Sequence, residues 1–138
     1  MDEKEMHKDV YKAKKWNFII IGFFAAIFLF ALVGLGIYTY QHTFTVEKWF
    51  EAPNDRIKIV DDLIKRYKLI GKTEQEIISL LGEEEEYANT KTSFKMSEEY
   101  FEPESTIIYH LGVRYVDDMW LILILENGIV VDYRIDAT

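Results

Sequence analysis

One uninterrupted apolar run dominates the hydrophobic pattern of this 138-residue chain. Residues 18–38 carry no charge, and these 21 positions match the roughly 20 that a helix needs to cross a ~30 Å hydrocarbon core. Trp16 lies before the run and Tyr40 after it, where aromatic rings favour the membrane interface. The pattern predicts a transmembrane helix over residues 17–40.

Apolar positions recur at the helical period after a connecting segment. Residues 57, 60, 64 and 67 are all apolar or aromatic, which predicts a helix from Asp55 to Tyr67 with Asn54 as its N-cap. A second, shorter helix follows, because Thr73 and Glu76 form the T-x-x-E pattern of a capping box. Gly82 is placed to end this second helix in a left-handed conformation.

The last third of the chain has the pattern of β-strands. Three strands are predicted, over Thr106–Leu111, Trp120–Glu126 and Ile129–Ile135. Asn127-Gly128 joins the last two strands and is a strong signal for a type I′ hairpin turn. The predicted fold is therefore α+β, with a transmembrane helix followed by two helices packed on a three-stranded antiparallel meander.

A two-residue turn fixes the expected pairing of this hairpin. It pairs Glu126 with Ile129, and continuing outward it pairs Ile124 with Val131, Ile122 with Tyr133 and Trp120 with Ile135. That face is almost wholly apolar, so we expect it to receive the helices. The opposite face then carries Leu121, Leu123 and Leu125. This leucine stripe either lies under residues 83–105 or is open to a partner.

The charge of the chain is unevenly distributed. Residues 1–16 contain five lysines and four acids, whereas residues 41–138 contain 11 basic and 20 acidic residues, a net charge of −9. So acidic a segment is poorly suited to phosphate backbones, which argues against nucleic-acid binding. The basic stretch at residues 12–15 places the N-terminus in the cytoplasm by the positive-inside rule. Residues 41–138 are therefore expected outside the cytoplasm.

The residues capable of catalysis or metal binding do not form a recognisable site in the sequence. The chain has no cysteine, and its three histidines are His7, His42 and His110, too scattered for a metal triad. Residues 83–86 are four adjacent glutamates, a pattern more typical of a solvated loop than of a calcium site. The sequence around Lys72 lacks the upstream glycine of a phosphate-binding loop. We therefore expect no catalysis, no bound metal and no cofactor.

The motifs between the helices and in the hairpin resemble the SmpA/OmlA (BamE-like) domain over about residues 44–136. Members of that family are typically secreted or lipoprotein modules that bind other proteins, and the best known help to assemble outer-membrane β-barrels. The resemblance implies a binding function and no catalysis. The chain departs from the family because it lacks the lipobox cysteine and has Gly82-Glu83-Glu84 where many members have G-x-P. The matching residues are Leu69, Gly71, Thr73, Glu76, Ile77, Leu80, Leu81, Gly82, Tyr109, Leu111, Gly112, Leu123, Asn127, Gly128 and Val130.

The sequence thus predicts a cytoplasmic tail (1–16), a transmembrane helix (17–40), a connector (41–52) and an extracytoplasmic domain (53–138). The expected function is that of a non-enzymatic protein–protein interaction module, anchored in the inner or plasma membrane of a bacterium. Its expected contacts are the lipid bilayer along residues 17–40 and a protein partner in the envelope. The candidate partner-binding residues are Leu121, Leu123, Leu125, Tyr109 and Tyr115.

Two alternative functions remain open from the sequence. The chain could be an immunity or inhibitor protein whose acidic residues, at positions 83–86, 98 and 99, neutralise a basic toxin or enzyme. It could also be an accessory subunit of a membrane complex, held through small residues of its span such as Gly22, Gly34 and Gly36.

Overall fold

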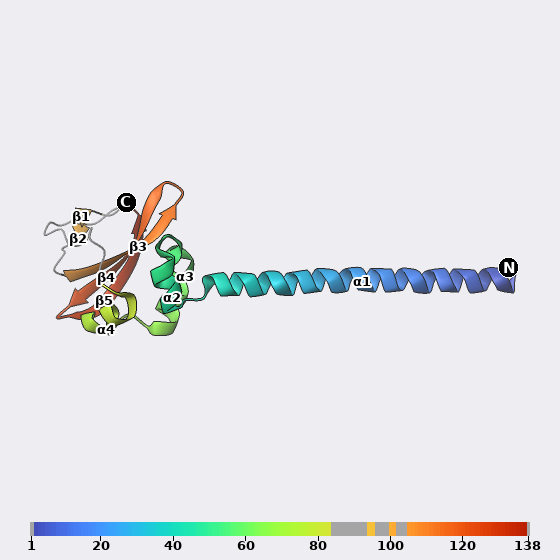
Figure 1. The fold of residues 1–138 in the computed structure, drawn as a ribbon, viewed down its shortest axis with the longest axis horizontal. Coiled ribbons are helices and arrows are strands. Elements are labelled where there is room, and N and C mark those ends of the chain that lie inside the picture. The colour runs from blue at the N-terminus through green and yellow to red at the C-terminus, as the bar shows by residue number, and fades with distance from the viewer. Residues whose placement is uncertain (1, 84–93, 96–99, 102–104, 138) are drawn as a thin grey trace. The chain divides into compact units, whose positions relative to one another are not determined.

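The computed structural model describes residues 2–83, 94–95, 100–101 and 105–137, and the chain forms two compact units, Met1–Tyr40 and Gln41–Thr138 (Figure 1). Helix α1 (Glu3–His42) accounts for nearly all of the first unit. Its 40 residues span about 60 Å at 1.5 Å per residue, so the helix extends beyond the predicted span of residues 17–40. By length and composition, α1 is the one helix of the described residues that could cross a membrane.

The second unit is an α+β domain. Its three-stranded antiparallel sheet has the order β3-β4-β5, and a separate ladder pairs β1 with β2. The chain order places short helices before the sheet, as the sequence predicts. The helical elements are α2 (Val46–Glu51), the 3-10 turn η1 (Pro53–Asp55), α3 (Arg56–Tyr67) and α4 (Glu74–Leu81); the strands are β1 (Phe94–Lys95), β2 (Tyr100–Phe101), β3 (Thr106–Arg114), β4 (Asp117–Glu126) and β5 (Ile129–Ala137).

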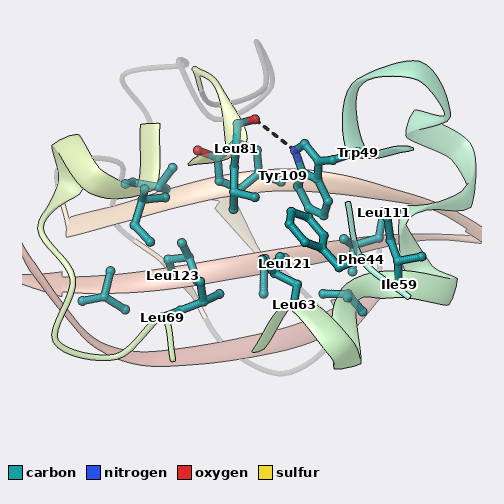
Figure 2. Close-up of a cluster of buried hydrophobic side chains, with 14 residues drawn as sticks. Phe44, Trp49, Ile59, Leu63, Leu69, Leu81, Tyr109, Leu111, Leu121 and Leu123 are labelled. Carbon is teal, nitrogen blue, oxygen red and sulfur yellow. Dashed lines mark hydrogen bonds between the residues drawn. The ribbon is translucent and has the colours of Figure 1, made fainter. Parts of the chain in front are cut away.

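The main hydrophobic core lies between the helices and one face of the sheet (Figure 2). Each of α2, α3 and α4 contributes buried side chains, and all three long strands contribute the opposing ones. Trp49 of α2 and Phe44, just before it, are both buried, so the segment predicted as a connector is part of this core. The buried members are Phe44, Trp49, Ile59, Val60, Leu63, Leu69, Ile77, Leu81, Ile107, Tyr109, Leu111, Leu121, Leu123 and Val130.

The predicted assignment of sheet faces is wrong for β4, and a β-bulge explains why. Glu126 pairs with Ile129 and Leu125 with Val130, in the register that a two-residue turn predicts, but Ile124 pairs with Asp132 instead of Val131. Val131 is therefore an extra residue on β5, and every later pair is shifted by one position. A shift of one residue exchanges the two faces of a strand relative to its neighbour.

As a result, the leucine stripe faces the helices. Leu121 and Leu123 share this face with Ile135 and Tyr133 of β5, their direct partners across the ladder. The residues predicted to meet the helices, Trp120, Ile122 and Ile124, form a smaller cluster with Ile108 instead.

The ends of the short helices follow their local sequence signals in part. The capping box of α4 is confirmed, because the Thr73 side chain accepts from the Glu76 amide and the Glu76 side chain accepts from the Thr73 amide. Gly82 ends α4 with a φ of +86°, a value that favours glycine, although its ψ of −178° is not that of a left-handed helix. The prediction of Asn54 as an N-cap is wrong, because Asn54 lies inside η1 and α3 begins at Arg56.

A buried polar network ties α2 to the rest of the domain. The Trp49 indole donates to the carbonyl of Leu81 at 3.0 Å (Figure 2). Arg56 is 7% exposed, and its guanidinium lies 4.6 Å from the centre of the Trp49 ring and donates to the carbonyls of Trp49 and His110. These bonds satisfy polar groups that would be costly to bury alone.

One edge of the sheet carries hydrogen bonds within its own strand. In β5, Asp132 accepts from the next amide, that of Tyr133, at 2.9 Å. Asp136 accepts from the amide of Ala137 in the same way, at 2.8 Å. At the start of the strand, the backbone of Val130 bonds instead to Gly71 and Lys72.

Candidate functional site

The residues predicted to bind a partner are separated by the fold. Leu121, Leu123 and Tyr109 are buried under the helices (Figure 2), and Leu125 is half-buried at the edge of the same core. The prediction that these leucines form an outer face is wrong for the reason given above. Tyr115 is the one member of the set that is exposed, with 89% of its surface accessible.

Within the described part of the second unit, the most exposed large apolar residues lie at the turn between β3 and β4. Tyr115 and Val116 form this turn, and Val116 is also 89% exposed. Val113 is exposed close by, and the Arg114 guanidinium lies 5.9 Å from the centre of the Tyr115 ring. We name residues 113–116 the β3–β4 tip.

The backbone of this turn is unusual for its sequence. Tyr115 has a φ of +62°, in a region that glycine and asparagine enter much more easily than tyrosine. The other turn of the sheet places Asn127 and Gly128 at φ values of +53° and +74°, where both residue types are favoured. The fold therefore keeps a large aromatic side chain where a small residue would be less strained, a pattern typical of functional positions.

A groove of about 480 Å³ lies between the end of α3 and the exposed side of α4. Tyr67 and Leu80 give it an apolar part, and both are half-buried. The β4–β5 turn lies beside the start of α4, because the amide of Glu74 donates to the carbonyl of Gly128. We name this space the α3–α4 groove. Its lining residues are Tyr67, Lys72, Thr73, Gln75, Glu76, Ser79 and Leu80.

The polar side chains of the α3–α4 groove bond to one another and to the helix backbone. Thr73 Oγ1 lies 3.0 Å from the Glu76 carboxylate, which also accepts from the Thr73 amide at 2.8 Å. Ser79 donates its hydroxyl to the carbonyl of Gln75 at 2.7 Å. The Thr73 hydroxyl and the Glu76 carboxylate thus belong to the N-terminal cap of α4, and the Ser79 hydroxyl bonds to the backbone of the same helix.

We expect Thr73→Ala to lower the free energy of unfolding by about 1 kcal/mol, because the variant loses the N-cap of α4. The two hydrogen bonds from Thr73, the backbone one first, lower the pKa of Glu76. The contribution of the Glu76 carboxylate to the free energy of unfolding is therefore complete above the ordinary pKa of a glutamate. It is lost as the pH falls through the lower pKa that Glu76 has in the folded state. Urea unfolding of the full chain at several pH values measures both effects. Ser79→Ala is the control and should change stability by less than about 0.5 kcal/mol.

Other candidate chemical groups of the sequence lie apart from this groove. His110 lies in β3, and its Nε2 is 2.9 Å from a carboxylate oxygen of Asp118 in β4. Within the described residues, no group of three or more His, Asp or Glu side chains is arranged to hold a metal ion. The acidic run begins at the exposed Glu83, and the rest of it, with positions 98 and 99, lies outside the described residues.

Comparison with known proteins gives no assignment: no protein family, no curated protein and no solved structure matches the chain. The SmpA/OmlA resemblance therefore stays a prediction that rests on the motif residues alone.

Sequence reasoning missed the α3–α4 groove entirely. It identified the helices that form the walls, but the space depends on how the end of α3 approaches α4, and no local motif reports that distance.

Proposed function

We propose that this chain is a non-enzymatic interaction module of the bacterial envelope, anchored in the membrane by α1 and binding a protein partner through the α3–α4 groove. The observation that carries the proposal is the groove itself, whose apolar surface from Tyr67 and Leu80 is framed by polar side chains. Protein-binding surfaces commonly combine an apolar centre with a polar rim.

The arrangement of polar groups supports binding over catalysis. An enzyme of the hydrolase or transferase type needs a nucleophile or proton carrier within reach of a base, in a site that a substrate can enter. The hydroxyls in the groove are held in helix-capping and helix-backbone bonds, and the His110–Asp118 pair belongs to the β-sheet. The polar groups of the groove can therefore orient a partner without reacting with it.

The anchored topology follows from charge and apolar length together. The lysines at positions 12, 14 and 15 favour a cytoplasmic N-terminus, which places the domain outside the cytoplasm. Its net charge of −9 favours protein partners over nucleic acid. The SmpA/OmlA resemblance points in the same direction, because members of that family bind proteins. An anchor in the inner or plasma membrane suits a chain that has no lipobox cysteine.

Site-specific photocrosslinking in the native cell tests the partner site. A photoreactive residue at Ser79, on the exposed side of the groove, should capture one envelope protein. The control carries the same photoreactive residue in place of Asp61, which is exposed on α3 outside the groove lining. This control should not capture that protein. Equal capture from both positions, or none from Ser79, would argue against the groove as the site.

A blocking variant then tests whether the captured protein depends on the groove. Ser79→Arg places a long charged side chain over the apolar part formed by Tyr67 and Leu80, and we expect the affinity to fall about tenfold or more. Because Ser79 is exposed, the stability of the domain should change little. Unchanged affinity in a folded variant would contradict the proposal.

A further inference from the structure

Among the described residues of the domain, the β3–β4 tip combines the largest apolar exposure with a positive φ at a non-glycine residue. Tyr115 and Val116 have the greatest exposure of all the large apolar side chains that the structure describes. Exposed apolar residues at the end of a hairpin cost solubility and contribute nothing to the core. The tip is therefore a candidate for contact with a partner outside the domain.

The covalent path from α1 restricts where the domain can be. Phe44 is fixed inside the domain, since its side chain is 1% exposed and its amide donates to Asp62 at 2.7 Å. Only residues 41–43 separate it from Tyr40, which follows the apolar run. Even fully extended, four peptide steps cover no more than about 14 Å. If α1 crosses a bilayer, the domain must therefore lie at its surface.

The base of the tip adjoins the elements that follow Phe44 in the chain. A Cβ atom on Gly112 would lie 2.0 Å from the carbonyl oxygen of Asn54, so the backbones of β3 and η1 are in direct contact there. The rings of Trp49 and Tyr109 also meet, with 5.7 Å between their centres. The tip thus extends from the part of the sheet that packs on α2 and η1. The Asn127-Gly128 turn lies at the other end of β4, about 30 Å away along ten residues.

We propose that the β3–β4 tip inserts into the interface of the same bilayer that α1 crosses, so that the domain has a second contact with the lipid. The inference rests on the proposed membrane anchorage. Tyrosine favours the headgroup region, valine the upper acyl region, and arginine can keep its guanidinium among the headgroups while its stem lies deeper. These are the residue types of the tip.

The charge of the surroundings indicates which lipid chemistry applies. Asp117 and Asp118 directly follow the tip, and the domain as a whole is acidic, so attraction to anionic lipids cannot hold it. The contact is apolar, and it forms with zwitterionic phosphatidylcholine and persists at high salt. In this arrangement Arg114 lies among the headgroups, and the opposite end of β4 points away from the lipid. The α3–α4 groove, which lies beside the β4–β5 turn at that end, then also faces away from the lipid.

Depth-dependent fluorescence quenching tests the proposal on the full chain. Because the chain has no cysteine, single variants accept one label each: Val116→Cys at the tip, Glu126→Cys beside the opposite turn, and Leu29→Cys within α1. Each carries an environment-sensitive fluorophore in phosphatidylcholine vesicles that contain lipids spin-labelled at shallow or deep positions. We expect the Val116 label to be quenched by the shallow lipids, the Leu29 label by the deep ones, and the Glu126 label by neither.

The outcomes separate the two proposals. A Val116 label that is no more quenched than the Glu126 label, while the Leu29 label is quenched, overturns the tip contact and leaves the anchorage standing. An unquenched Leu29 label overturns the anchorage and the tip contact with it. If the emission of the Val116 label shifts to the blue in native membranes, while in pure lipid vesicles the label is neither shifted nor quenched, the tip binds a protein partner and the lipid proposal is overturned.

A second variant keeps the test independent of folding. Tyr115→Gly removes the aromatic ring and relieves the positive φ, so the domain should unfold at the same or a higher temperature. Quenching of the Val116 label in this background should fall to the level of the Glu126 label. If quenching persists undiminished, Tyr115 does not contribute to the contact and the proposal fails in its present form.

Discussion

Leu123→Asp should unfold the α+β domain formed by the second unit. Leu123 is fully buried between β4 and the helices, so the variant places a carboxylate in an apolar core (Figure 2). Burying an unpaired charge costs at least about 4 kcal/mol, a large part of the 5–15 kcal/mol by which domains are stable. Pulse proteolysis of the full chain in urea measures the loss.

Val131→Asp is the matched control for this experiment. Val131 lies in the same sheet, is the extra residue of the bulge on β5, and is 38% exposed. Its substitution should change stability by less than about 0.5 kcal/mol. A Leu123→Asp chain that unfolds at the wild-type urea concentration would show that the leucine stripe is outside the core.

Trp49→Ala should be nearly as damaging, although Trp49 lies in a six-residue helix. The side chain is fully buried, it stacks on the Arg56 guanidinium, and its indole donates to the carbonyl of Leu81. Truncating a buried tryptophan costs about 3–5 kcal/mol. The loss also leaves the Leu81 carbonyl without this donor, so the end of α4 should open first. Hydrogen exchange of the α4 and β3 amides measures both effects.

The neighbouring residue provides the comparison for this second prediction. Phe50 follows Trp49 in α2, but half of its surface is exposed. Phe50→Ala should cost less than about 1 kcal/mol and leave exchange in β3 unchanged. Similar exchange in both variants would show that α2 is not a fixed part of the core.

Local signals in the sequence predicted the local structure well. Thr73, Glu76 and Gly82 delimit α4 because capping depends on residues within one helical turn. Asn127-Gly128 fixes the β4–β5 turn and its first pair for the same reason.

The incorrect predictions, those of the sheet faces and of the exposed leucines, concern features that depend on residues far apart in the sequence. The bulge at Val131 allows Leu123 and Tyr133 to share one face, and it occurs where the neighbouring Val130 bonds to Gly71 and Lys72. A pairing scheme built from the turn alone cannot include that contact. Of the candidate partner-binding residues, Tyr115 remained at the surface because it lies in a turn, whereas Tyr109 and the leucines lie in strands that the helices cover.

The hydrogen bonds along β5 affect how readily the domain can associate with other copies of itself. An edge strand normally offers free amides to any other extended chain, which is how sheets grow into aggregates. On β5 the carboxylates of Asp132 and Asp136 already occupy the amides of Tyr133 and Ala137. An incoming strand would have to displace both carboxylates and accept their negative charge beside its own backbone. The β5 edge of the sheet is thus a poor template for an added strand from another copy of the domain.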